Sequence, residues 1–219
     1  MYIINQYLNG GGLPVDNLIA EYLFDNNQLD TSGNDYHLDG GSVPSYSTNR
    51  HSVANSCAVF NGTNEVESTL IISASLGTIS ELSFSYWIKF TSTALNMRLI
   101  SFGTASTGQT YCKITSRNSY NFSLGTGDAS LNVQNALPLN NDLWHHVVYT
   151  VDGSTSAMNL YVDNDFVDSL PDTASFTDSA YTRFRIAGIG FQRYTGSIDD
   201  IRIYNKILSI SEIAALFNE

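Results

Sequence analysis

The segment with the clearest chemical content lies near the C-terminal end, where residues 196–205 read Gly-Ser-Ile-Asp-Asp-Ile-Arg-Ile-Tyr-Asn. Side chains alternate between the two faces of a strand, so this pattern puts Asp199 on the same face as Ile201. Asp200 and Arg202 fall on the opposite face. A carboxylate on an apolar face is costly unless a metal ion or strong hydrogen bonds satisfy it. Asp199 is therefore the residue whose partners need to be explained.

A second concentration of oxygen donors lies in residues 25–35, which read Asp-Asn-Asn-Gln-Leu-Asp-Thr-Ser-Gly-Asn-Asp. Calcium takes six to eight oxygen ligands from carboxylates, amides and backbone carbonyls, and this loop is dense in them. The alternative is that Asp30 and Asn34 only cap turns. The net charge of −11 is equally compatible with cation binding and with simple solubility.

The residue types used in catalysis occur, but their spacing does not favour an active site. His145 and His146 are adjacent, so in a strand they face opposite ways and cannot form one site. Glu65 and Glu67 would share a face in a strand, as the two acids of a glycosidase require. The preceding residues 61–64 (Asn-Gly-Thr-Asn) are typical of a turn, so we interpret this segment as a loop and expect no enzymatic activity.

Composition favours an all-β domain with a polar surface. Hydrophobic residues make up 42% of the 219-residue chain, enough for a sizeable core, whereas charged residues make up only 14%. Helical surfaces need more Lys and Glu than this. The chain has 10 Lys and Arg against 21 acids and no basic cluster, which argues against nucleic acid or an anionic membrane as partner.

The first residues carry no basic segment and too short an apolar run for a signal peptide, and no stretch is long enough for a membrane span. We expect residues 1–17 to be a tail that includes a flexible joint of three glycines, with residues 18–219 forming one domain. The apolar side chains before that joint are expected to dock on the domain or on a partner chain. Cys57 and Cys112 could form a disulfide, but two buried free thiols are the expected state.

Short strands separated by turn residues account for the rest of the chain. Residues 82–90 alternate between apolar and polar side chains and predict a half-buried strand. Residues 158–162 and 166–169 predict a hairpin, because the intervening Asp163-Asn164-Asp165 tolerates the positive φ of a tight turn. Residues 209–212 (Ser-Ile-Ser-Glu) form a capping box that predicts one short helix to about residue 217. Further strands are predicted at residues 18–24, 98–102, 111–116, 120–124, 144–151, 183–189 and 197–204.

The ordered set of motifs resembles the concanavalin A-like jelly roll of the laminin-G and pentraxin group. The matching segments, in the family's order, are residues 20–25, 30–34, 58–62, 82–89, 144–148, 160–163 and 196–205. The resemblance implies an all-β, two-sheet antiparallel jelly-roll sandwich, with six to seven strands in each sheet and neighbouring termini. Members of this family are usually carbohydrate- or protein-binding modules of extracellular proteins. Asp35 and Asn164 stand where the family often has glycine, and Asp35 adds a carboxylate to the acidic loop.

The resemblance also implies one structural calcium ion near the termini, with residues 25–35 beside the last strand. Asp25, Asn27 and Asp199 are then the expected side-chain ligands. Asp30 and a backbone carbonyl near His37 are weaker additions. The alternative remains that Asp199 accepts backbone N–H bonds instead.

A sugar site needs exposed aromatic rings for stacking, with amides and charged groups to bind hydroxyls. Tyr111, Tyr120 and Tyr194 fall in or near loops, and polar residues such as Asn118 and Arg193 lie close to one or another of them in sequence. The expected ligand-binding residues are Tyr111, Tyr120, Tyr194 and Arg193. We expect Trp87 and Trp144 to be core residues.

We therefore expect a non-catalytic recognition module that binds a glycan or glycoprotein surface and contains structural calcium. The expected location is extracellular, or on a virion or cell surface. The alternative is a structural or adhesion component of a larger assembly, a virion or a cell-surface protein, anchored through residues 1–17.

Overall fold

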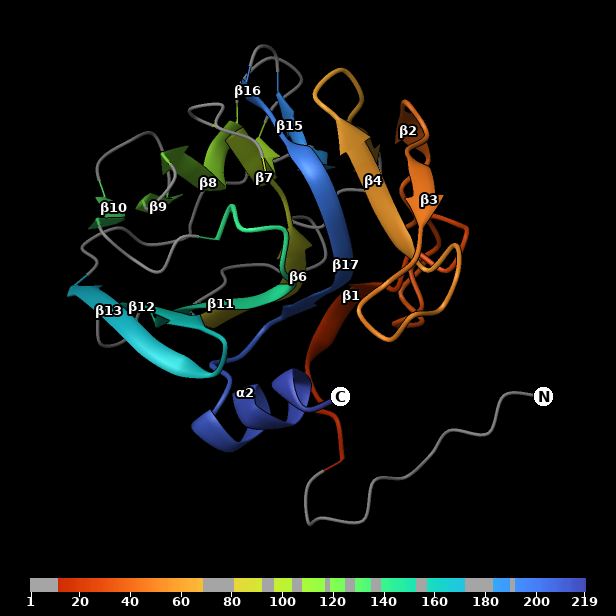
Figure 1. The fold of residues 1–219 in the computed structure, drawn as a ribbon. Coiled ribbons are helices and arrows are strands. Elements are labelled where there is room, and N and C mark those ends of the chain that lie inside the picture. The colour runs from red at the N-terminus through yellow and green to blue at the C-terminus, as the bar shows by residue number, and fades with distance from the viewer. Residues whose placement is uncertain are drawn as a thin grey trace.

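The computed structural model describes residues 12–68, 81–91, 97–103, 108–116, 119–124, 129–134, 139–152, 157–171, 183–189 and 192–219. These residues form two sheets that pack face to face, with one short helix on the outside (Figure 1). The predicted two-sheet antiparallel sandwich is confirmed, but the expected number of six to seven strands per sheet is wrong, because the described residues form eight strands in one sheet and nine in the other. The predicted docking of residues 1–8 falls outside the described residues and stays a prediction.

Sheet A has eight strands in the described part of the chain, in the order β13-β12-β11-β6-β17-β4-β3, with β1 also paired to β17. The first and last strands of the domain are thus direct neighbours. The strands are β1 (Leu18–Tyr22), β3 (Ser45–Ser47), β4 (Cys57–Asn61), β6 (Glu81–Lys89), β11 (His145–Asp152), β12 (Ala157–Val162), β13 (Asp165–Pro171) and β17 (Thr195–Tyr204).

Sheet B has nine described strands in the order β10-β9-β8-β7-β14-β5-β2, with β15 and β16 attached beside β7. All the pairings are antiparallel except the contact between β16 and β7. The strands are β2 (Gly40–Gly41), β5 (Val66–Ser68), β7 (Met97–Gly103), β8 (Gly108–Ser116), β9 (Ser119–Leu124), β10 (Ala129–Gln134), β14 (Arg183–Ile186), β15 (Gly188–Ile189) and β16 (Gln192–Arg193).

Alternation along the central strands builds the core between the sheets. In β6, Leu82, Phe84, Tyr86 and Ile88 point toward sheet B and pack with residues such as Ile100 and Phe184. The prediction of a half-buried strand is wrong for the other face of β6. Ser83 and Ser85 on that face are buried as well, because further structure covers it, and the burial of Trp87 on the same face confirms its expected place in the interior.

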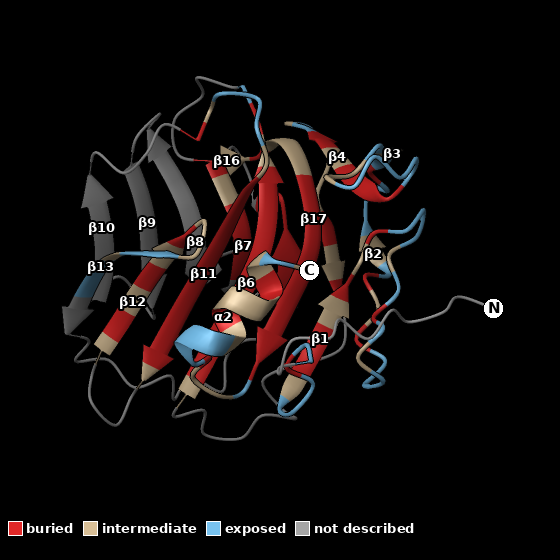
Figure 2. Ribbon diagram, turned by 60° about the horizontal axis from the view of Figure 1, so that its bottom comes forward, coloured by how far each residue is buried: buried red, intermediate tan, exposed pale blue. Residues whose placement is uncertain are grey.

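The covering structure is helix α2 (Ile210–Phe217). Its predicted capping box is confirmed, since the Glu212 N–H donates to Ser209 Oγ and the Ser209 N–H donates to the Glu212 carboxylate. Ile213 and Leu216 pack against Val148 of β11 and Tyr204 of β17. Figure 2 shows α2 lying across the outer face of sheet A, over strands that are buried along most of their length.

The predicted hairpin is also confirmed. Strands β12 and β13 pair around Asp163 and Asn164, whose φ angles are 52° and 70°. Two successive positive φ angles match the right-handed twist of the flanking strands, which is why Asp and Asn are favoured there.

Among the described residues, no helix is both long and apolar enough to cross a membrane.

Candidate functional site

Strand β17 places Asp199 on the opposite face from the one that simple alternation predicts. Asp199 pairs with Trp87 of β6, and Arg202 pairs with Ser85, so three steps on β17 match two on β6. This is a β-bulge, and Asp200 supplies the extra residue with a φ of 44°. The bulge turns Asp199 to the outer face of sheet A, beneath α2. The prediction that Asp199 shares the apolar face of Ile201 is therefore wrong.

The partner of Asp199 is Arg50, from the loop that precedes β4. Arg50 Nη1 lies 3.0 Å from Asp199 Oδ2 and also donates to the carboxylate of Asp200. The Asp200 N–H donates to Asp199 Oδ1 at 3.1 Å. Burial, followed by the neighbouring Asp200 carboxylate, raises the pKa of Asp199 to about 8, against the opposing effect of Arg50.

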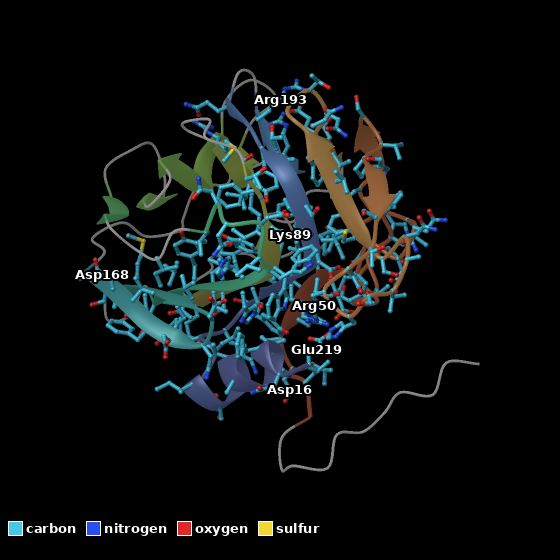
Figure 3. All side chains as sticks on the ribbon, viewed as in Figure 1. Asp16, Arg50, Lys89, Asp168, Arg193 and Glu219 are labelled. Carbon is cyan, nitrogen blue, oxygen red and sulfur yellow. The ribbon has the colours of Figure 1, made fainter. Side chains whose placement is uncertain are left out.

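Arg202 ties the C-terminal residue to the sheet. Its Nη1 and Nη2 atoms donate to the two carboxylate oxygens of Glu219 at 2.6 and 2.7 Å, and its Nε donates to Glu21 at 2.7 Å. This side chain is buried rather than solvent-exposed as the alternation pattern suggested. Burial alone would lower the pKa of Arg202, but the Glu219, Asp200 and Glu21 carboxylates raise it overall. Figure 3 shows Arg50 and Glu219 beside each other near α2.

We call Glu21, Arg50, Asp199, Asp200, Arg202 and Glu219 the α2 charge cluster. Four carboxylates face two guanidinium groups in a region that excludes most water. Such a group stabilises the fold only while its members stay paired, because an uncompensated buried charge costs several kcal/mol. The cluster therefore holds α2 and the last residue onto the outer face of sheet A.

Aromatic rings close one side of the α2 charge cluster. The Arg50 guanidinium lies 4.7 Å from the centre of the Trp87 ring, and Trp87 stacks on both His146 and Phe217. His146 Nε2 is 2.7 Å from Ser85 Oγ. Burial, and then the charges of Arg50 and Arg202, lower the pKa of His146 to about 3. The ring is thus neutral at physiological pH, and this Ser-His pair is shielded from solvent.

In the acidic loop, Asp30 is the buried member. Its carboxylate accepts hydrogen bonds from the backbone N–H groups of Glu21, Ser32 and Tyr36 and from Ser32 Oγ, all at 2.9–3.0 Å. The Asp30 N–H in turn donates to His37 Nδ1 at 3.0 Å. Asp30 is therefore the organising residue of the loop, as in the alternative that assigned it a turn-capping role.

The other predicted calcium ligands each take part in different local interactions. Asp25 and Asn27 are exposed, and Asn27 caps its own turn through bonds to the Asp25 carbonyl and the Leu29 N–H. Asp199 is paired with Arg50. No three His, Cys, Asp or Glu residues of the described ranges are grouped so that they could hold a metal ion. These side chains do not fit the expected calcium site, and bound calcium stays a prediction that only a metal measurement tests.

The predicted ligand-binding residues lie in different places. Tyr194 is fully buried, and its hydroxyl donates to backbone carbonyls of Lys89 and Ser197, so its assignment to a binding face is wrong. Arg193 donates to the Thr63 carbonyl and lies 3.8 Å from Glu65. Tyr111 lies opposite Ser101 and Ser123 in register, and Tyr120 opposite Ile114. The side chains of these two tyrosines fall outside the description, so their role stays a prediction.

The residues considered for catalysis have other partners. Glu67 lies in β5 rather than in a loop, and its carboxylate accepts from Arg185 Nε at 2.9 Å. Glu65 faces Arg193, as described above. His145 and His146 do face opposite ways, because they pair with Ile88 and Trp87 respectively. His145 contacts Asp163 at 2.7 Å and Asn141 at 3.0 Å.

Cys57 is a buried free thiol, and its burial raises the pKa of the thiol to about 11.

Two features of the site have little trace in the sequence. Arg50 stands alone in a loop 149 residues before Asp199, and no motif connects the two. Strand β17 carries its bulge at an aspartate, where a glycine would have been the usual signal. A positive φ at Asp200 is within the range that aspartate tolerates, so the composition of the segment does not reveal it.

The sequence profile described as "Concanavalin A-like lectin/glucanases superfamily" matches residues 61–214, most of the domain just described. The chain belongs to the concanavalin A-like lectin/glucanase superfamily. The resemblance noted from the motifs is thereby confirmed. A comparison with curated proteins finds no match.

Solved structures of this superfamily's fold superimpose well at low sequence identity. The binding domain of botulinum neurotoxin DC, solved in complex with SialylT, has a TM-score of 0.69 and 18% identity over 93% of this chain and 52% of that one. This chain thus spans about half of that structure. Domain 4 of AbnA, an extracellular arabinanase from Geobacillus stearothermophilus, was solved with arabinotriose. It has a TM-score of 0.66 and 18% identity over 91% of this chain and 97% of that domain.

Proposed function

We propose that this chain is a carbohydrate-recognition module without catalytic activity. The observation that carries the proposal is the sandwich of the lectin/glucanase superfamily formed by the described residues, which is similar to two domains that were solved with sugars bound. Domain 4 of AbnA is matched over nearly its whole length, and it is one domain of a larger enzyme. A separate recognition module of this size is therefore a reasonable unit of function.

The contacts of the acidic residues support binding over hydrolysis. A glycosidase needs one carboxyl group to protonate the leaving oxygen and a second to act on the other side of the sugar. The closely spaced Glu65 and Glu67 both face arginine side chains: Glu65 lies 3.8 Å from Arg193, and Glu67 accepts a hydrogen bond from Arg185 Nε at 2.9 Å. Both carboxylates are thus directed at basic side chains of this chain, rather than arranged as an acid pair on either side of a sugar.

The test is a glycan array probed with the purified chain, followed by titration calorimetry of the best oligosaccharide. We expect saturable binding of an intact oligosaccharide, with no release of shorter products after prolonged incubation. Heat-denatured chain serves as the control for non-specific adhesion. Absence of binding across the array would contradict the proposal, and accumulation of cleavage products would contradict the absence of catalysis. Running the array with and without a chelator also measures the calcium requirement.

A further inference from the structure

One aromatic pair stands open on the outer face of sheet A, beside the part that α2 covers. The Phe166 ring meets the Tyr161 ring edge-on, with centroids 5.6 Å apart. Phe166 is 58% exposed and is the one aromatic among the large hydrophobic residues that are exposed in the described part of the chain. Tyr161 is half-buried and packs against the cluster beneath α2, which fixes its position.

Polar side chains form the next row along the same strands. Tyr161 and Phe166 are cross-strand partners, and two residues along β12, Asn159 is the partner of Ser169. Residues two apart share a face of a strand and lie about 7 Å apart. Asn159 Nδ2 donates to Thr150 Oγ1 at 3.2 Å, and this hydrogen bond fixes the orientation of the amide on this face. A firm aromatic surface thus adjoins an amide and an exposed hydroxyl, at a spacing that a sugar residue spans.

The charges around the pair select among ligands. Residues 157–171 contain three aspartates and no Lys or Arg. Asp165 and Asp168 are exposed. In register, Asp165 and Asp168 pair with the core-facing Val162 and Leu160, so they are not assigned contacts with a sugar on the Tyr161 face. Their negative charge at this edge of the sheet still disfavours a carboxylate-bearing sugar such as sialic acid relative to an uncharged one. The C–H face of a pyranose or furanose ring is also suited to stacking on an aromatic ring.

We propose that Tyr161 and Phe166 are the stacking platform of a binding site for uncharged glycans, with Asn159 and Ser169 binding the sugar hydroxyls. This assignment rests on the proposed recognition function and gives it a location and a ligand class. The site differs from the residues expected from sequence, of which Tyr194 is in the core.

The experiment compares variants of the full chain on a panel of uncharged oligosaccharides, arabinotriose included, and on sialylated forms of the galactose-terminated members. Phe166→Ala is expected to weaken binding of the best uncharged glycan at least tenfold, and Phe166→Tyr to retain it. Asn159→Ala is expected to weaken binding about fivefold or more, since it removes one hydrogen bond to the sugar. Val43→Ala is the matched control, because Val43 is a 71% exposed apolar residue in the segment that leads into β3, the opposite edge strand.

The outcomes separate the two proposals. If the wild type binds uncharged glycans and Phe166→Ala binds them equally well, this site is wrong while the recognition function stands. A preference of the wild type for the sialylated members would overturn the assigned ligand class. If the wild type binds nothing on the panel, both proposals fail. Because Phe166 is exposed, its replacement should leave the melting temperature nearly unchanged, so lost binding cannot be attributed to unfolding.

Discussion

Asp30 is the residue on which the acidic loop depends, because one carboxylate accepts four hydrogen bonds there. In Asp30→Asn, one acceptor oxygen becomes an NH₂ group that faces N–H donors, so at least one buried donor loses its partner. We expect a loss of about 2 kcal/mol in the free energy of unfolding. Urea denaturation measures it. Asp25→Asn, in the same loop but exposed, should change stability by less than about 0.5 kcal/mol.

Two buried titratable groups beneath α2 give opposite contributions to the pH dependence of stability. His146 has a pKa of about 3 in the fold and near 6.5 when unfolded, so the unfolded chain binds the extra proton between these values. Its contribution makes stability rise with pH across that window. Asp199 has a raised pKa of about 8, so the folded chain holds the extra proton from about pH 4 upward. Its contribution makes stability fall as the pH rises.

We expect these contributions to offset each other between about pH 4 and 6.5 in the wild type, and single substitutions to expose them. Relative to the wild type, the stability of Asp199→Asn should rise with pH in this window by up to about 1.4 kcal/mol per pH unit, because the His146 contribution is then unopposed. The stability of His146→Gln should fall with pH by a similar slope. Urea unfolding at half-unit pH steps gives both slopes. Parallel pH profiles for all three proteins would rule out the linkage.

At the level of elements, the C-terminal helix is held by packing and by the two bonds between Arg202 and Glu219. Glu219→Gln leaves the buried Arg202 guanidinium with one neutral acceptor in place of a carboxylate. We expect a loss of about 2 kcal/mol in the free energy of unfolding, because removing the negative charge of Glu219 leaves the positive charge of the buried Arg202 less well compensated. Ile210→Ala, at a 72% exposed position of the same helix, is the control and should lie within about 0.5 kcal/mol of wild type.

Most of these elements are predictable because local patterns set them. Apolar alternation is sufficient for β6, and the Asp163-Asn164 turn for the β12–β13 hairpin. The capping box gives the start of α2. Alternation does not predict that α2 docks on sheet A, and this docking buries Ser85 on the face expected to be solvated. That burial depends on contacts between residues far apart in sequence.

The candidate site is less predictable than the fold for the same reason. The sequence pointed to Asp199 as a buried acid in need of a partner, and this is confirmed, but its face was wrong because of the bulge at Asp200. Its partner Arg50 comes from a distant loop. The sequence placed Tyr161 and Phe166 in two predicted strands of a hairpin. Only the register of β13 on β12 shows that their two rings meet on an uncovered face.

On the scale of the whole molecule, charge imbalance is the main property, with 21 acids against 10 basic residues. Exposed like charges repel in the folded chain, and this repulsion is screened over about 8 Å at physiological ionic strength. Part of the surplus negative charge is internal, where the Glu21, Asp200 and Glu219 carboxylates face two arginines beneath α2, while Asp199, with its pKa raised to about 8, keeps its proton at neutral pH. The internal part is insulated from salt, so only the surface part should respond to it.

We therefore expect the melting temperature to rise between 10 and 150 mM NaCl, and we use calcium at matched ionic strength to separate screening from specific binding. Because Asp30 and Asp199 already have partners and Asp25 and Asn27 are exposed, calcium should raise the melting temperature no more than magnesium or sodium of equal ionic strength. Asp199→Asn should then behave alike with and without chelator, since its partner is Arg50. A rise specific to calcium, reversed by chelator, would instead establish a calcium site. Its loss in Asp25→Asn but not in Asp199→Asn would assign that site to the exposed part of the acidic loop.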